Sequence, residues 1–260
     1  MDYRTISLAE EDGVATVTLE APERLNAIDP RMAVELAHVF GAASAWRAIL
    51  LTGAGRAFSS GADLSPDAAK SAGDEIQDPS AWLDTVYNPM VVAIRDCACP
   101  VVTAVNGPAV GIGCALALMG DIVVAKQSAY FLQAFRRVGL IPDGGSTFLL
   151  PRLVGKARAM ELMLLGDRLD AQTALDWGLI NRAVPDDALM PTAREIARSL
   201  AKGPASLGLI RSAIWASLDV DWARQLANER QAARLAVHTS DYKEGVQAFL
   251  EKRPPEFTGH

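Results

Sequence analysis

Cysteine is scarce in this sequence of 260 residues, which contains only Cys97, Cys99 and Cys114. Three cysteines cannot form a closed set of disulfides, and the Cys97-Ala98-Cys99 segment has no second cysteine–histidine pair to complete a zinc site. We therefore predict that all three are small buried residues and that the chain has no metal site.

Positive charge and long apolar runs are also lacking. The formal net charge is −6, the sequence pI is about 5.2, and the arginines are scattered rather than clustered. Such a chain has no basic patch to neutralise nucleic-acid phosphates. No run reaches the roughly 18 apolar residues of a membrane span, and residues 1–13 lack the layout of a signal peptide. These absences predict a soluble, cytoplasmic protein without nucleic-acid or membrane partners.

Several common cofactor and catalytic motifs are missing. Leu116 stands where a dinucleotide-binding fingerprint requires its third glycine, and no phosphate-binding P-loop occurs. There is no G-x-S-x-G elbow, and none of His38, His238 and His260 is an obvious general base. Nicotinamide, ATP and serine-hydrolase chemistry are therefore disfavoured, and we expect neither a redox nor a metal cofactor.

Apolar strands alternate with helical patterns over residues 1–190, which predicts an α/β fold with substantial parallel pairing. Residues 191–260 carry helical patterns and form a predicted C-terminal helical region. The polar segment 66–80 shows little periodicity and predicts a mobile loop. Strand patterns occur at 13–22, 47–53, 100–107 and 121–125, and helical spacing at 31–43, 80–97 and 111–121.

Two glycine-flanked turns, within residues 51–64 and 106–118, each follow a predicted buried strand. Glycines beside a helix start leave backbone N–H groups unpaired, and these can bind an anion without a charged side chain. Two such turns facing each other could supply two donors to one developing oxyanion. The alternative is that these glycines only permit tight turns.

Asp143 lies in V-G-L-I-P-D-G-G-S-T (138–147), between an apolar run and two glycines. It could cap the helix that follows, or it could be a reagent. Ser146 or Thr147 could equally begin that helix. The stretch by itself leaves both interpretations open.

Several segments resemble, in order, the signatures of the enoyl-CoA hydratase/isomerase, or crotonase, family. The resemblance implies a stack of β-β-α turns closed by a C-terminal helical trimerisation region, as a homotrimer or a dimer of trimers. It also implies acyl-CoA thioester substrates, with coenzyme A as the substrate carrier. The matching segments cover nearly the whole chain: LNAID (25–29), TGAGRAFSSGADL (52–64), NGPAVGIGCALALMGDIVVA (106–125), GLIPDGGSTFLLPRLVG (139–155) and EGVQAFLEKRPPEF (244–257).

The resemblance also implies roles for individual residues. The backbone N–H groups of Ala62 and Ile112 would bind the thioester oxygen and stabilise an enolate. Lys252 and Phe257 resemble residues that reach the CoA of a neighbouring subunit. For Arg24 and Lys252 the alternative is a solvated surface charge. The residues expected around CoA in the same subunit are Arg24, Ala27, Ser60, Ala62, Asp63 and Leu64.

The sequence departs from the family's hydratases at both water-activating glutamates, where it has Ala115 and Phe135. What remains is Asp143, which matches the P-D-x-G aspartate of the ring-epoxide and enoyl-CoA isomerases of phenylacetate breakdown. One carboxylate suffices to take a proton from C2 of a 3-enoyl-CoA and return it at C4 through a dienolate. We therefore favour an isomerase with Asp143 as the acid/base.

Burial beside Phe135, Val138 and Leu140 is expected to raise the pKa of Asp143. Three alternatives stay open: a hydratase of fatty-acid β-oxidation, an aryl-CoA dehalogenase, and an acyl-CoA binding protein without turnover. The dehalogenase would need a histidine in the site, and residues 55–100 contain none. Candidate acyl-pocket residues, for which core packing is an equal alternative, are Trp82, Val86, Tyr87, Met90, Phe135 and Phe148.

Overall fold

The computed structural model describes residues 2–65 and 80–260, in which six strands form one sheet in the order β1-β2-β3-β4-β6-β9. The β1–β2 pair is antiparallel, and each of the other neighbours pairs in parallel. The predicted α/β fold with parallel pairing is confirmed. The strands are Ile6–Glu11, Val14–Leu19, Ala48–Gly53, Val101–Val105, Ile122–Lys126 and Arg182–Val184.

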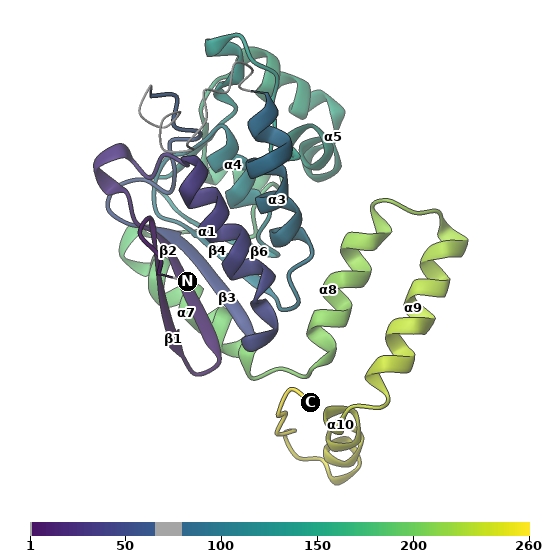
Figure 1. The fold of residues 1–260 in the computed structure, drawn as a ribbon. Coiled ribbons are helices and arrows are strands. Elements are labelled where there is room, and N and C mark those ends of the chain that lie inside the picture. The colour runs from purple at the N-terminus through teal and green to yellow at the C-terminus, as the bar shows by residue number, and fades with distance from the viewer. Residues whose placement is uncertain (1, 66–79) are drawn as a thin grey trace.

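The central strands β3 and β4 are buried along their whole length because helices cover both faces of the sheet. Helix α7 (Leu189–Ala201) packs on one face, against side chains such as Leu50 and Val102. Helices α1 (Pro30–Gly41) and α3 (Asn88–Arg95) lie on the opposite face (Figure 1). Strands covered on both sides need apolar residues at every position, which explains the unbroken apolar runs in the sequence.

Helix α1 begins where the sequence predicts, at Asp29 and Pro30. The Asp29 carboxylate accepts a hydrogen bond from the Met32 amide at 2.8 Å, and proline occupies the first helical position. Leu83–Tyr87 forms a short π-helix that leads into α3. Apart from Ser80, the loop expected at 66–80 lies outside the described residues.

A smaller sheet stands at the end of the main one and is built from β5, β7 and β8. It carries α4, α5 and α6, and α5 is interrupted at Gly155, where the backbone leaves helical geometry. The strands are Ala109–Val110, Tyr130–Leu132 and Leu169–Asp170, and the helices are Ile112–Leu118, Ser146–Leu165 and Ala171–Asp176. Short 3-10 helices span Pro22–Arg24, Ala43–Ala45, Ala134–Val138 and Asp186–Ala188.

The last three helices form a C-terminal arm that extends away from the sheets (Figure 1). The arm consists of α8 (Ser206–Ser217), α9 (Trp222–Ala236) and α10 (Ser240–Glu251). Helix α7 crosses the expected boundary at residue 190 and packs on the sheet. Trp222 and Phe249 on the arm are 77% and 81% exposed, so the arm presents apolar surface that one chain does not cover.

The three cysteines are free and buried, as predicted. Among the described residues, no helix is long and apolar enough to cross a membrane. The same residues contain no group of three or more His, Cys, Asp or Glu side chains that could hold a metal ion.

Two asparagines hold the loop that follows β3. The Asn26 side chain is completely buried, accepts from the Ala21 amide at 3.0 Å and donates to the Ala57 carbonyl at 2.8 Å. Asn106 donates to the Gly53 carbonyl at 2.7 Å and accepts from the Gly53 amide at 3.2 Å. The two side-chain amides hold the loop in place. Buried backbone groups of a loop need hydrogen-bond partners, and outside the sheet no neighbouring strand supplies them.

We expect Asn26→Ala to lower the free energy of unfolding by about 2 to 4 kcal/mol, because it leaves buried backbone groups without partners. Urea unfolding followed by circular dichroism measures the change. The exposed Asn88→Ala serves as the matched control and should stay within about 0.5 kcal/mol of wild type. Equal stability of the two variants would contradict this role for Asn26.

Candidate active site

The loops that follow β3 and β4 meet edge to edge. The Val110 amide donates to the Ser59 carbonyl at 2.9 Å, and Ser59 pairs with Ala109 in a parallel bridge. Gly61 and Gly111 stand beside this bridge with φ of +98° and +54°. A β-carbon on Gly61 would lie only 2.9 Å from the Val110 carbonyl oxygen. Glycine is therefore required here both for the backbone angle and for the close approach.

The amides of Ala62 and Ile112 follow these two glycines and lie on the facing turns. Within residues 2–65 and 80–260, neither N–H donates to a protein acceptor. Ile112 is the first residue of α4, where amide groups have no partner inside the helix. Two unpaired backbone donors on adjoining turns form an arrangement that can bind an oxyanion.

The turn that carries Asp143 lies against the first turns of α4. A β-carbon on Gly144, whose φ is +60°, would lie 2.9 Å from Cβ of Ala115 and 3.1 Å from Cγ1 of Ile112. Ala115 is small enough to leave room for this approach. Asp143 is therefore the neighbour of a residue, Gly144, that contacts α4. The first amide of α4, that of Ile112, is unpaired.

Asp143 does not cap α5. Gly145 is the N-cap residue, and Asp143 contributes only its backbone carbonyl, which accepts from the Ser146 amide at 3.0 Å. The carboxylate atom Oδ1 is buried and has no hydrogen-bond partner among the described residues. Burial raises the pKa of Asp143 to about 6, because the charged form loses solvation that a hydrogen bond from its own backbone offsets only in part. The capping interpretation is therefore wrong, and the carboxylate is free to act on a ligand.

The Tyr87 side chain lies among three carboxylates and holds one of the site loops. Burial, followed by the charges of Asp29, Asp143 and Asp63, raises the pKa of Tyr87 well above its ordinary value. Its hydroxyl donates to the Ile28 carbonyl at 3.1 Å. Tyr87 is therefore neutral and engaged in a structural hydrogen bond, and it does not offer a free proton to a substrate.

The loop before α1 and the loop after β3 are joined by backbone hydrogen bonds. The Ile28 amide donates to the Gly61 carbonyl at 2.7 Å, and the Asp63 amide donates to the Ile28 carbonyl at 3.1 Å. The structure thereby brings together the residues that the family resemblance assigns to CoA in the same subunit: Arg24, Ala27, Ser60, Ala62, Asp63 and Leu64.

Arg24 is ion-paired rather than freely solvated. Its guanidinium lies 3.2 Å from the Asp29 carboxylate and also pairs with Asp63. Burial by itself would raise the pKa of Asp63, but hydrogen bonds from Ser65 and the pairing with Arg24 hold it below its usual value. The Arg24 side chain is still 36% exposed, which leaves an edge of the guanidinium open to a ligand.

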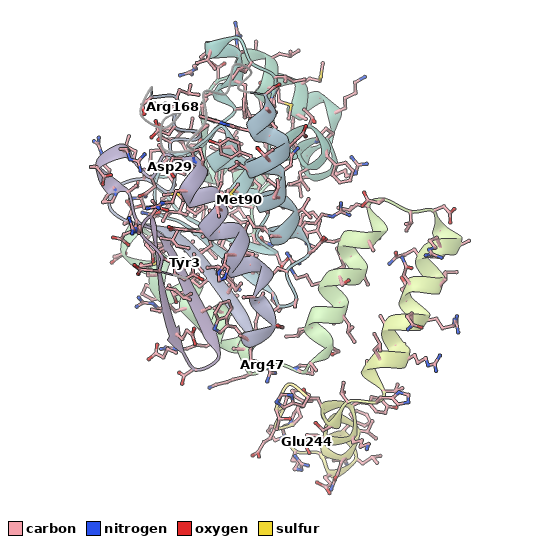
Figure 2. All side chains as sticks on the ribbon, viewed as in Figure 1. Tyr3, Asp29, Arg47, Met90, Arg168 and Glu244 are labelled. Carbon is pink, nitrogen blue, oxygen red and sulfur yellow. The ribbon has the colours of Figure 1, made fainter. Side chains whose placement is uncertain are left out.

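Lys252 and Phe257 are not brought to the other site residues within one chain. Lys252 ends α10 in the left-handed conformation and is exposed, and the Phe257 ring packs near Gly245. Figure 2 shows Asp29, beside the expected CoA loops, and Glu244, on α10, at opposite ends of the molecule. Within the single chain, these two residues therefore lie far from the loops expected to hold CoA.

The residues expected around the acyl group fall into two sets. Met90 is completely buried between α1 and α3 (Figure 2) and Tyr87 is 5% exposed, so both belong to the hydrophobic core. Phe135 approaches Gly111, where a β-carbon would lie 3.8 Å from its ring. The partly buried members of the predicted set are Trp82, Val86 and Phe148.

One part of the predicted surroundings of Asp143 is wrong. Val138 and Leu140 are 55% and 56% exposed, so they do not form a buried wall in the single chain. Their segment follows a short 3-10 helix and turns at Gly139 in the left-handed conformation, which directs it outward. The next residue, Gly144, packs on α4 against Ala115 and Ile112.

Sequence reasoning missed Asn26, Asn106 and the Tyr87 hydroxyl, although each holds the site loops in place. A weak signal was present for Asn106 alone, which stands between the end of β4 and Gly107. Apart from the Ala21 amide, the partners are backbone groups 28 to 59 residues away, and no local pattern reveals them.

Fold and site together define an α/β protein with two unpaired backbone amides on adjoining glycine turns and a carboxyl group on a third turn that packs against the same helix. The chain belongs to the enoyl-CoA hydratase/isomerase family, whose model matches residues 9–260.

Relatives of known name support this membership. The chain is 46% identical over 253 residues to the 1,2-epoxyphenylacetyl-CoA isomerase of Escherichia coli K12, covering 96% of each protein. It is 45% identical over 261 residues to a “probable enoyl-CoA hydratase” of Rhodobacter capsulatus, covering 100% of each. The crystal structure of enoyl-CoA hydratase from Bacillus anthracis matches with a TM-score of 0.90 at 32% identity, over 99% of this chain and 100% of that one.

The raised pKa of Asp143 predicts how stability depends on pH. A carboxyl whose pKa is about 6 when folded and 3.8 when exposed destabilises the folded state as pH rises through 6. Asp143→Asn should therefore gain roughly 1 to 3 kcal/mol over wild type between pH 4 and pH 8. Urea unfolding at both pH values measures this gain. The exposed Asp167→Asn is the control, and a gain of the same size there would refute the assignment.

Proposed function

We propose that this protein is an acyl-CoA isomerase that shifts a double bond, or opens a ring epoxide, with Asp143 as its acid/base. The observation that carries the proposal is the buried Asp143 Oδ1, which has no partner among the described residues and lies on a turn against α4. An unpaired carboxylate beside unpaired amides is costly to stability, and a substrate that binds both groups accounts for it.

The proposed reaction uses the two parts of the site in sequence. The thioester oxygen of a 3-enoyl-CoA accepts hydrogen bonds from the amides of Ala62 and Ile112. These donors strengthen as negative charge develops, and each is worth about 3 kcal/mol in the transition state. Ionised Asp143 then removes a proton from C2, and the dienolate is reprotonated at C4 by the same carboxyl group. The product is the conjugated 2-enoyl-CoA.

The residues at the hydratase positions support isomerisation over hydration. Ala115 is 1% exposed and Phe135 is 7% exposed, and neither side chain can carry a proton. The similarity to a relative named as an epoxyphenylacetyl-CoA isomerase supports a ring-bearing acyl group. The half-buried Trp82 and the buried Phe135 are aromatic residues suited to such a group.

We propose that CoA lies across the joined loops of residues 24–29 and 60–64. Arg24 would exchange part of its pairing with Asp29 and Asp63 for a phosphate contact, because a guanidinium can serve more than one anion. The arm of a neighbouring subunit would contribute Lys252 and Phe257. We propose that the chain assembles as a homotrimer, alone or as a dimer of trimers.

We expect Asp143→Asn to lower the turnover of 3-enoyl-CoA to 2-enoyl-CoA by about 10² to 10⁴-fold, because it removes the proton carrier and leaves the binding groups in place. Incubation in deuterated water with detection of deuterium at C2 and C4 measures the step. For wild type, kcat/KM should rise with pH through about 6, as the carboxyl group ionises.

The exposed Asp167→Asn variant is the control and should keep wild-type turnover and pH profile. Isomerisation by Asp143→Asn at the wild-type rate would refute the role of Asp143. Hydration of crotonyl-CoA that survives Asp143→Asn would favour a hydratase with another acid/base. Tight binding of a CoA ester without deuterium exchange in wild type would favour a binding protein.

The proposed assembly is tested on the arm. Wild type should have a mass in solution three or six times that of the 27.7 kDa chain. Phe249→Glu places a charge on an 81% exposed apolar residue of α10 and should shift the population toward monomer. Analytical ultracentrifugation measures the distribution, and Gln247→Glu on the same helix is the matched control. A wild-type monomer at micromolar concentration would contradict the assembly.

A further inference from the structure

Two thiols that the proposed reaction does not use lie close together in the turn between α3 and β4. The Sγ atoms of Cys97 and Cys99 are 3.9 Å apart, and the residues are only 4% and 5% exposed. The third cysteine, Cys114, lies on α4 and is buried by itself. A pair of thiols at this separation is within a small rearrangement of the S–S bond length of about 2.05 Å.

A buried arginine holds this turn from the C-terminal arm. The Arg211 guanidinium donates to the carbonyls of Cys97 at 2.8 Å and Ile94 at 2.7 Å. It also pairs with the Asp121 carboxylate at 2.7 Å, and its side chain is 3% exposed. The turn with the two thiols is therefore the point at which α8 is fastened to the body of the protein.

The same surroundings favour reaction at Cys97. The hydrogen bond with Cys99 and the charge of Arg211 lower the pKa of the Cys97 thiol, which increases its thiolate fraction. The interaction with Cys97, together with burial, raises the pKa of Cys99. Cys97 is therefore the sulfur suited to attack an oxidant, and Cys99 is the sulfur suited to react with Cys97 in a second step.

A cavity gives a small molecule access to Cys97. It has a volume of about 230 Å³ and is lined by Cys97, Arg211 and Trp215 among others. A water molecule occupies about 30 Å³ in the liquid, so a molecule of hydrogen peroxide fits with room to spare. Cys99 is not among the lining residues, which places the first reaction at Cys97.

We propose that Cys97 and Cys99 form a reversible intramolecular disulfide when the protein meets a peroxide. The Cys97 thiolate attacks one peroxide oxygen, so that an S–O bond forms, the O–O bond breaks and hydroxide leaves as water after protonation. The Cys99 sulfur then attacks Cys97, so that the S–S bond forms, the S–O bond breaks and a second water leaves. Two thiols lose two electrons in total, and the peroxide gains them.

The disulfide changes the contacts by which Arg211 attaches α8 to the body of the protein. Closing the sulfurs from 3.9 Å to a bond requires the backbone of the turn to shift, and the Cys97 carbonyl is part of that backbone. Arg211 then loses the geometry of one of its buried acceptors. Oxidation therefore loosens α8, the first helix of the arm, and reduction restores it.

Peroxide treatment of the full-length protein, followed by unfolding and thiol titration, tests the modification. Wild type should fall from three titratable thiols to one, with a mass lower by two hydrogens that dithiothreitol restores. The tryptic peptide of residues 96–126 carries all three cysteines, so variants assign the bond. Cys114→Ser should still lose two thiols, whereas Cys97→Ser and Cys99→Ser should form no intramolecular bond.

Wild type that keeps all three thiols, or that loses them only to sulfinic acid or to bonds between chains, would overturn the proposal. So would an equal loss of two hydrogens in Cys99→Ser. Hydrogen exchange of residues 206–217 tests the consequence in oxidised wild type. Faster exchange that dithiothreitol reverses supports the loosening of α8, and unchanged exchange refutes it. Because none of these measurements uses substrate, their outcome is independent of the proposed isomerase activity.

Discussion

The close approach of two glycine turns is the constraint on which the site depends. Gly61 and Gly111 bring the loops after β3 and β4 into contact, and a β-carbon at Gly61 would collide with a carbonyl oxygen. The contact directs the unpaired amides of Ala62 and Ile112 to neighbouring positions. Neighbouring parallel strands end at the same edge of a sheet, so the loops that follow them lie close enough to meet. Hydrogen bonds from the asparagine side chains and from the Tyr87 hydroxyl hold these loops in this arrangement.

The burial of the Asp143 carboxyl group has a cost in stability. A buried carboxylate without a partner opposes folding, and the protein retains it on a turn held by Gly144 against Ala115 and Ile112. Ala115 is part of the same arrangement, because a long side chain at position 115 would occupy the space that this turn fills.

Two arginines, of which Arg211 is buried, help to fasten the C-terminal arm. Arg211 joins α8 to the turn after α3 and to Asp121, and Arg47 donates to the carbonyls of Gly203 and Thr258. Figure 2 shows Arg47 at the end of the body that faces the C-terminal segment. A buried guanidinium needs several acceptors, so these joints depend on geometry more than apolar packing would. An arm held in this way can keep one position while its apolar faces stay open for other subunits.

The sequence by itself determined the α/β class, the strands β2, β3, β4 and β6, the start of α1 at Asp29-Pro30 and the two glycine turns, because these features depend on local spacing and on residues with restricted backbone angles. It also identified Asp143 and the missing glutamates. Only the tertiary structure decided that Asp143 is an unpaired carboxylate and not a cap, that Met90 is core, and that Val138 and Leu140 are exposed. Burial and hydrogen-bond partners depend on segments far apart in the chain, and Asn26 meets Ala57 only after the strands between them have paired.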